Sequence, residues 1–185
     1  MIRITGGEFR SRIFQVPDLP GLRPTPSRVR EALFSMVGPL AGKCVLDLFS
    51  GSGLMALEAL SRGADSVFSI ESSAPACRHL EQVRNRFGVQ SRWRLLDGEL
   101  PQALAPLAGS HFDLVYADPP YAQGWSEQIP LWLQRNHIEC ALLVIEESSR
   151  VSPLWPSCWQ AAKVRRYGET SLHLLQPSVV AEEQH

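Results

Sequence analysis

Long apolar runs are missing from this sequence of 185 residues: no stretch is long enough to cross a bilayer, and the first residues form no apolar signal segment. Cysteine is scarce as well, with four residues and no CxxC pair among them. These absences argue against an integral membrane protein, a disulfide-stapled secreted domain and a zinc ribbon. We therefore expect a cytoplasmic protein with reduced thiols and no metal site.

Lysine is nearly absent too, since only Lys43 and Lys163 among the 18 basic residues are lysines. The net charge of −1 alone argues against a nucleic-acid partner. The distribution of the charges does not argue against such a partner. Residues 1–37 hold six arginines against three acidic residues, a net charge of +3, and the remainder carries −4. Arginine suits bidentate phosphate contacts and stacking on bases. A GC-rich genome would also favour arginine, so this signal stands only beside others.

The first 37 residues differ in pattern from the rest. Residues 2–16 predict a small β-hairpin around Gly6-Gly7, and a turn-rich connector follows. From Ser27 we expect a helix, because apolar residues recur at helical spacing (Val29, Leu33, Phe34 and Val37). Residues 1–37 are thus predicted to form an N-terminal extension, a β-hairpin plus a helix.

From residue 38 onward, apolar strands alternate with helices, which is typical of a parallel sheet covered on both faces. We expect an α/β, Rossmann-like fold with a mostly parallel seven-stranded sheet, an antiparallel C-terminal hairpin and one core domain at 38–178. A flexible tail is expected at 179–185. The predicted strands are 44–49, 66–71, 93–96, 112–117, 141–145, 163–166 and 170–175, and the helices are 54–61, 74–87, 102–107 and 125–134.

A glycine-rich turn, Leu48-Phe49-Ser50-Gly51-Ser52-Gly53, separates the first core strand from its helix. Together with Ala56 the glycines satisfy the dinucleotide-binding fingerprint, and Glu71 follows at the distance expected for a residue that binds ribose hydroxyls. The pattern predicts a nucleotide-like ligand and fits either NAD or S-adenosylmethionine.

Asp47 favours S-adenosylmethionine over NAD, and further carboxylates lie at the neighbouring strand ends. Asp47 lies just before the loop, where it suits an ammonium group and would repel a pyrophosphate. Asp97, at the end of the third strand, is placed to accept from the adenine amino group. With Glu71 and Asp118, carboxylates follow four successive strands, and ligands in such sheets bind outside the carboxyl ends of the strands.

The segment Val115-Tyr116-Ala117-Asp118-Pro119-Pro120-Tyr121 runs an apolar strand into a carboxylate, two prolines and a ring. Proline cannot continue a sheet ladder, so a stiff strand end is expected. An exocyclic amino group of a nucleobase is a poor nucleophile, because its lone pair is delocalised into the ring. We predict that Asp118 and the Pro119 carbonyl accept its two N–H hydrogens, while Tyr121 stacks on the base.

The loop LDLFSGSG, Glu71, Asp97 and DPPY together resemble the class I S-adenosylmethionine-dependent amino-methyltransferases, which act on adenine N6, cytosine N4, guanine N2 or a protein glutamine. Four further stretches narrow the resemblance to the bacterial 16S ribosomal RNA guanine-N2 methyltransferases (RITGGEFRSR, LRPTPSRVREALF, ALSRGADSVFSIE and RRYGETSLHLL). The similarity covers nearly the whole chain. Ser11 stands where that family commonly has glycine, and Glu169 where aspartate is usual.

This resemblance implies S-adenosyl-L-methionine as cofactor and a guanine of 16S rRNA as target, within an assembled or assembling small ribosomal subunit. We expect a monomer. The predicted site residues are Asp118, Pro119, Pro120 and Tyr121 for catalysis; Asp47, Phe49, Ser50, Gly51, Gly53, Glu71 and Asp97 for the cofactor; and Arg10, Arg12, Arg23, Arg28 and Arg30 for RNA phosphates.

Two other classes of function stay open. One is a different amino-methyltransferase, acting on DNA adenine N6 or a protein glutamine; a DNA enzyme is expected to carry a separate target-recognition domain. The other is an NAD-binding oxidoreductase or a non-catalytic nucleotide-binding module, against which Asp47 and the Asp118 motif argue. The residues by themselves do not choose guanine over adenine.

Overall fold

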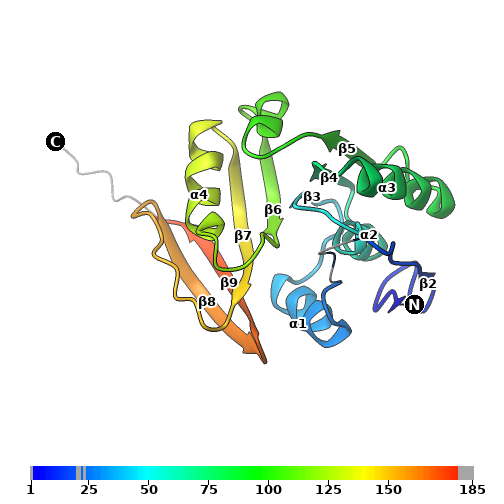
Figure 1. The fold of residues 1–185 in the computed structure, drawn as a ribbon, viewed down its shortest axis with the longest axis horizontal. Helices are drawn as coiled ribbons and strands as arrows, with labels where there is room; N and C mark the ends of the chain where they lie inside the picture. The colour runs from blue at the N-terminus through cyan, green and yellow to red at the C-terminus, as the bar shows by residue number, and fades with distance from the viewer. Residues whose placement is uncertain (1, 20–21, 23, 179–185) are drawn as a thin grey trace.

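A seven-stranded sheet with the strand order β5-β4-β3-β6-β7-β9-β8 forms the centre of the molecule (Figure 1). The computed structural model describes residues 2–19, 22 and 24–178, so the predicted tail at 179–185 lies outside the described residues. Strands β3 to β7 run parallel, whereas β9 is antiparallel to β7 and β8. The predicted α/β fold class is confirmed. The strand bounds are β3 Cys44–Leu48, β4 Ser66–Glu71, β5 Trp93–Asp97, β6 His111–Ala117, β7 Glu139–Ser148, β8 Trp159–Tyr167 and β9 Thr170–Pro177.

Helices cover both faces of the sheet, and the pleat of the strands explains why. Neighbouring side chains point to opposite faces, so that Val45 joins one apolar cluster and Leu46 the other. The first cluster takes side chains from α1 (Ser27–Val37), α2 (Leu54–Ser61) and α3 (Ala74–Phe87), and the second from the 3₁₀-helix η1 (Gln102–Leu107) and α4 (Trp125–Arg135).

None of the described helices has both the length and the apolar character that spanning a bilayer requires.

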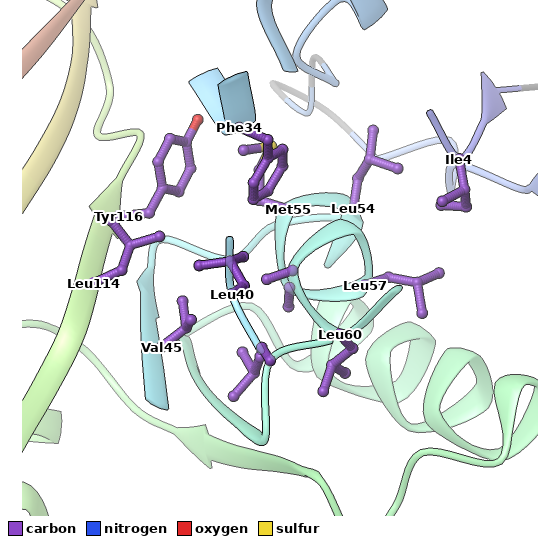
Figure 2. Packing of buried hydrophobic residues seen from close by; sticks show 14 of the residues in the cluster. Ile4, Phe34, Leu40, Val45, Leu54, Met55, Leu57, Leu60, Leu114 and Tyr116 are labelled. Atoms are coloured by element: carbon purple, nitrogen blue, oxygen red, sulfur yellow. The ribbon is translucent and has the colours of Figure 1, made fainter. Parts of the chain in front are cut away.

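The first cluster joins the sheet to α1 and α2. Figure 2 shows Val45 of β3 and Leu114 and Tyr116 of β6 beside Met55 of α2 and Phe34 of α1. Figure 1 shows α1 and α2 close to the end of β6 at which the chain leaves the strand. This packing places the start of α2 beside the carboxyl ends of the strands.

The order of strands along the chain reverses between β3 and β6. From β3 the chain goes on to β4 and β5 on one side, and from β6 to β7 on the other. Ligands of open α/β sheets bind where such a reversal occurs, at the carboxyl ends of the strands. The ends of β3 and β6 therefore border the expected site.

The N-terminal hairpin is shorter than predicted. Its strands β1 (Ile2–Arg3) and β2 (Ile13–Phe14) pair antiparallel over two residues each. Between them Ser11 has a φ of 68°, a left-handed conformation that costs a residue other than glycine about 1–2 kcal/mol. That conformation is a physical reason for the glycine common at this position in the family that the sequence resembles. Three side chains anchor the segment in the first cluster (Ile4, Phe9 and Phe14).

The buried carboxylate of Glu58 on α2 ties the extension to the core. It accepts hydrogen bonds from the Thr5 N–H at 2.8 Å, the Thr5 hydroxyl at 2.9 Å and Arg30 Nε at 3.0 Å. Arg62, directly after α2, lies at 3.4 Å from the second carboxylate oxygen. One side chain on α2 thus binds the segment after β1, helix α1 and the residue that follows α2.

The prediction that Arg30 contacts RNA phosphates is wrong in this structure. The Arg30 side chain is only 1% exposed. Besides Glu58, its guanidinium donates to the carbonyls of Thr25 at 2.6 Å and Arg3 at 2.8 Å. The sequence could not separate this arginine from its neighbours, because its partner Glu58 lies 28 residues away.

Strand β7 is longer than predicted, spanning Glu139–Ser148 where the sequence indicated 141–145. The apolar run ends at Ile145, but β9 continues the ladder by pairing Leu172 with Glu146 and Ser171 with Glu147. A strand extended through partner pairing thus carries two glutamates into the protein interior.

We expect Glu58→Ala to lower the free energy of unfolding by about 3–5 kcal/mol, because it leaves the buried Arg30 charge without its partner. Urea unfolding followed by circular dichroism measures this loss. Arg150→Ala is the matched control, since the Arg150–Glu169 pair is 80% and 84% exposed and such pairs contribute about 0–1 kcal/mol. Equal losses in the two variants would contradict the role given to Glu58.

Candidate active site

The carboxyl ends of four neighbouring strands bring acidic residues to one edge of the sheet. Glu71 ends β4 and pairs in register with Asp97, which ends β5. Asp47 lies one residue before the end of β3, and Asp118 directly follows β6. The sequence predicted these four carboxylates at successive strand ends, and the structure places them there.

The glycine loop is held by Glu71. One carboxylate oxygen accepts the Gly51 N–H at 2.7 Å, and the other accepts the Ser73 N–H at 2.7 Å. The Ser50 hydroxyl donates to the Asp47 carbonyl at 2.8 Å, which closes the turn. Each Glu71 oxygen retains a further lone pair, so the residue can organise the loop and still accept from a diol.

Gly53 has a second role that the fingerprint does not reveal. Its φ is 75°, and a Cβ there would collide with Leu80 on α3 and with the ring of Trp93 on β5. Gly51, with a φ of 51°, would meet only the flexible Leu22 side chain. Gly53 thus allows close packing of the loop against α3 and β5, while Gly51 allows the left-handed turn in which its N–H reaches Glu71.

Asp47 is a buried carboxylate with an unused acceptor. Its residue is 2% exposed, and among the described residues Oδ2 has no hydrogen-bond partner. Burial, aided by the negative charge of Glu71, raises the pKa of Asp47 to about 7. An unpaired buried oxygen is unfavourable unless a donor completes it. The arrangement fits a cationic or hydrogen-bond-donating ligand group at this point.

The motif after β6 is held by two glutamates of β7. Glu146 accepts the hydroxyl of Tyr116 at 2.8 Å and that of Tyr121 at 2.7 Å. Glu147 accepts the Ala122 N–H at 3.1 Å and the Ser126 hydroxyl at 2.7 Å. The two carboxylates therefore fix the segment on each side of the two prolines.

Tyr121 presents its ring at the surface while its hydroxyl is tethered. The residue is 37% exposed, and the hydroxyl lies 3.1 Å from Thr170 Oγ1 in addition to its bond to Glu146. From the sequence, only the ring was predicted to have a function. The structure adds an anchor for the hydroxyl, which determines how the ring stands beside Asp118.

Negative charges surround Asp118. Its pKa is raised well above the usual value by burial first, then by the charges of Glu146, Asp47 and Glu147. Burial likewise raises the pKa of Glu146, although the two tyrosine hydroxyls oppose this shift. Perturbed carboxyl groups that gather at a strand edge are a common property of functional sites.

Glu146 and Glu147 are the site residues that the sequence analysis missed. A signal was present in the sequence. The apolar run Ala141–Ile145 is followed by two adjacent carboxylates, just as each of four other core strands has one carboxylate at or near its end. Their inward placement depends on pairing with β9, which no local pattern indicates.

The arginines predicted to bind RNA differ in their surroundings. Arg10, Arg12 and Arg28 are exposed on the extension, and Arg23 lies outside the described residues. The Arg12 guanidinium stacks over the Phe87 ring, 4.3 Å from its centroid. A pocket of about 420 Å³ opens next to it between β2 and α3, lined by residues that include Phe14, Gln15, Gln82, Arg86 and Phe87.

Known proteins share this architecture. Ribosomal RNA small subunit methyltransferase D of Escherichia coli is 34% identical over 98% of this chain and 92% of its own length. A solved structure from Escherichia coli is 32% identical with a TM-score of 0.82, covering 96% of this chain and 98% of that chain. An RNA methyltransferase from Salinibacter ruber in complex with S-adenosyl-L-homocysteine shares the fold at 15% identity and a TM-score of 0.67, over 88% of this chain and 99% of that one.

The family model described as conserved hypothetical protein 95 matches residues 2–176. The match includes the N-terminal extension, all seven strands of the sheet, the glycine loop and the Asp118 motif. On this match and on the identity to the Escherichia coli ribosomal RNA methyltransferase, the chain belongs to the conserved hypothetical protein 95 family.

Proposed function

We propose that this protein is an S-adenosylmethionine-dependent methyltransferase that modifies the exocyclic N2 amino group of a guanine in 16S rRNA of the small ribosomal subunit. The observation that carries this proposal is the meeting of two elements at the β3–β6 reversal: a glycine loop above a buried, incompletely bonded carboxylate, and a proline-stiffened Asp118 motif. The relative named above supplies the substrate class, since its name specifies small-subunit ribosomal RNA.

The residues at the strand ends fit the cofactor. Asp47 offers its free oxygen to the ammonium of the methionine moiety, Glu71 accepts from the ribose diol, and Asp97 accepts from the adenine amino group. Phe49 and Ser50 complete the loop with Gly51 and Gly53. When bound, the cofactor supplies an electrophilic methyl group on a sulfonium.

The role of the Asp118 motif is to orient the amino group. Asp118 and the Pro119 carbonyl accept the two N–H hydrogens, which steers the nitrogen lone pair away from conjugation with the ring. Pro119 and Pro120 keep these acceptors in place, and the Tyr121 ring stacks on the base at about 1–3 kcal/mol per base. Orientation and electrostatic preorganisation then lower the barrier.

The partner is the folded RNA of the subunit. Arg10, Arg12 and Arg28 lie exposed on the extension, where guanidinium groups suit phosphate contacts. The target base leaves its stack to reach Asp118, as in other enzymes that act on a nucleobase. We infer that the enzyme works in the cytoplasm as a monomer, with residues 1–37 as the RNA-binding extension and 38–178 as the catalytic core.

The function is tested by comparing small-subunit rRNA from cells with and without the gene. We expect mass spectrometry to find one N2-methylguanine that disappears with the gene and returns when the purified protein and S-adenosylmethionine are added to subunits from the deficient cells. Loss of a methyl group from adenine or from a protein glutamine instead would select another amino-methyltransferase.

Asp118→Ala is expected to slow methyl transfer by about 10²–10³-fold, the usual effect of removing one preorganised hydrogen-bonding group. Cofactor affinity should be largely kept, because the lost acceptor faces the base. Single-turnover transfer to small-subunit particles at saturating cofactor measures the rate, and calorimetry measures the affinity. Asp65→Ala, at an exposed aspartate before β4, is the control. A rate near that of the control would remove Asp118 from the mechanism.

The acid limb of the rate profile should report on Asp118. Protonation turns one of its oxygens from an acceptor into a donor, so transfer falls as pH drops below the raised pKa of Asp118. Glu146→Gln removes a neighbouring negative charge and keeps an oxygen that can accept from a tyrosine hydroxyl. The pKa of Asp118 should then fall, and the limb should move to lower pH.

Single-turnover rates as a function of pH measure this shift, with Glu139→Gln as control at an exposed glutamate at the start of β7. A limb that stays in place in Glu146→Gln, or moves to higher pH, would show that the charge of Glu146 does not act on Asp118.

A further inference from the structure

Every charged residue of the edge strand β8 (Trp159–Tyr167) is basic. Its sequence contains Lys163, Arg165 and Arg166 and no acidic residue. All three side chains are exposed, as are most residues of the strand. This second group of cations was not predicted, because the net charge of the segments indicated a basic surface only on residues 1–37.

Among the described residues, these cations have no acidic partner. Within the described residues, none of the three lies within 4.0 Å of a carboxylate; the nearby ion pair, at the turn, joins Arg150 to Glu169. Arg165 Nη1 donates only to the carbonyl of the adjacent Val164, at 3.1 Å. Most of the donors on this strand are therefore available to an external partner.

The strand leads directly to the catalytic motif. Tyr167, its last residue, pairs with Thr170, and Thr170 Oγ1 lies 3.1 Å from the Tyr121 hydroxyl. Arg166 pairs with Ser171, the next step along the same ladder. The cations thus begin one residue from the rung that contacts the tyrosine of the Asp118 motif.

Strand β8 and the N-terminal hairpin lie on opposite sides of the molecule (Figure 1). Figure 1 shows β8 near one end of the longest axis of the molecule and β2 near the other, with α1 and α2 between them. In the ladder, Lys163 and Arg165 stand opposite Leu174 and Leu172, and Arg166 stands opposite Ser171, so the cations point to both sides of the strand.

We propose that β8 is a second RNA-contact surface, on which Lys163, Arg165 and Arg166 bind phosphates of the substrate on the side of the catalytic motif opposite to the N-terminal hairpin of β1 and β2. The inference rests on the proposed function and adds a second surface to it. Charge complementarity selects the occupant: a polyanion that also places a base at Tyr121 meets free cations along the adjoining strand.

Edge strands also carry charge to avoid pairing with other chains, which is a purely protective role. That role requires no cationic excess and no position beside the site. It predicts that removal of the charges produces self-association and leaves RNA affinity unchanged. RNA affinity and self-association therefore separate the two roles.

The test replaces Lys163, Arg165 and Arg166 together by Gln and measures binding to the small-subunit RNA over a series of salt concentrations. We expect affinity to fall at least tenfold, and the slope of log K against log salt to become shallower by about two units, because each phosphate contact contributes about 0.7–0.9. Cofactor affinity by calorimetry and the melting temperature should not change.

Arg135 provides the matched control, because it is an exposed arginine at the C-terminal end of α4, before the start of β7. That start pairs with the beginning of β6, at the opposite edge of the sheet from Asp118. Arg165→Glu should weaken RNA binding, Arg165→Lys should retain most of it, and Arg135→Glu should match the wild type. If the triple variant folds poorly, the Arg165 pair supplies the same comparison.

Unchanged affinity and salt slope in the β8 variants would overturn the inference, as would self-association of the triple variant with normal RNA binding. A failure of the proposed function looks different. In that case the wild-type protein itself transfers no methyl group to the RNA, whereas failure of the β8 inference leaves wild-type transfer intact and the variants equal to it.

Discussion

The buried Glu58 is the constraint on which the arrangement of the molecule depends. It lies on α2, the helix that begins directly after the glycine loop, and its partners come from the N-terminal strand segment and from α1. A buried ion pair contributes little net stability compared with an apolar contact, but it permits few alternative arrangements once formed. Here it sets α1 and the extension against the same helix that carries the loop.

A second constraint is the concentration of negative charge at the β3–β6 reversal. Burial first, and then the negative charges of Glu146, Asp47 and Glu147, raise the pKa of Asp118 well above its usual value. Such a cluster is unfavourable in the free protein. A positively charged ligand relieves it, because Coulomb attraction is strong where water is excluded. The proposed cofactor carries an ammonium and a sulfonium, and both charges suit this edge.

The net charge of −1 conceals an uneven distribution of charge over the surface. Acidic residues collect at the cofactor edge, whereas exposed cations lie on the extension and, by our inference, on β8. Tyr121 is in contact with the acidic residues and with the surface, because its hydroxyl donates to Glu146 and its ring is exposed. By our proposal the protein needs no overall basic charge to contact RNA, because exposed arginines gather on the extension and on β8.

The sequence by itself determined the alternation of strands and helices, the antiparallel hairpin at the end, and the positions of Asp47, Glu71, Asp97 and Asp118 at strand ends. These features depend on local periodicity, on glycine and on proline, whose effects are carried by neighbouring residues. The tertiary structure alone decided that Arg30 is buried on Glu58, and that Glu146 reaches Tyr121. Each of these contacts joins residues more than twenty positions apart. Whether a charged side chain faces water or a partner depends on what the fold brings against it, and no local pattern contains that information.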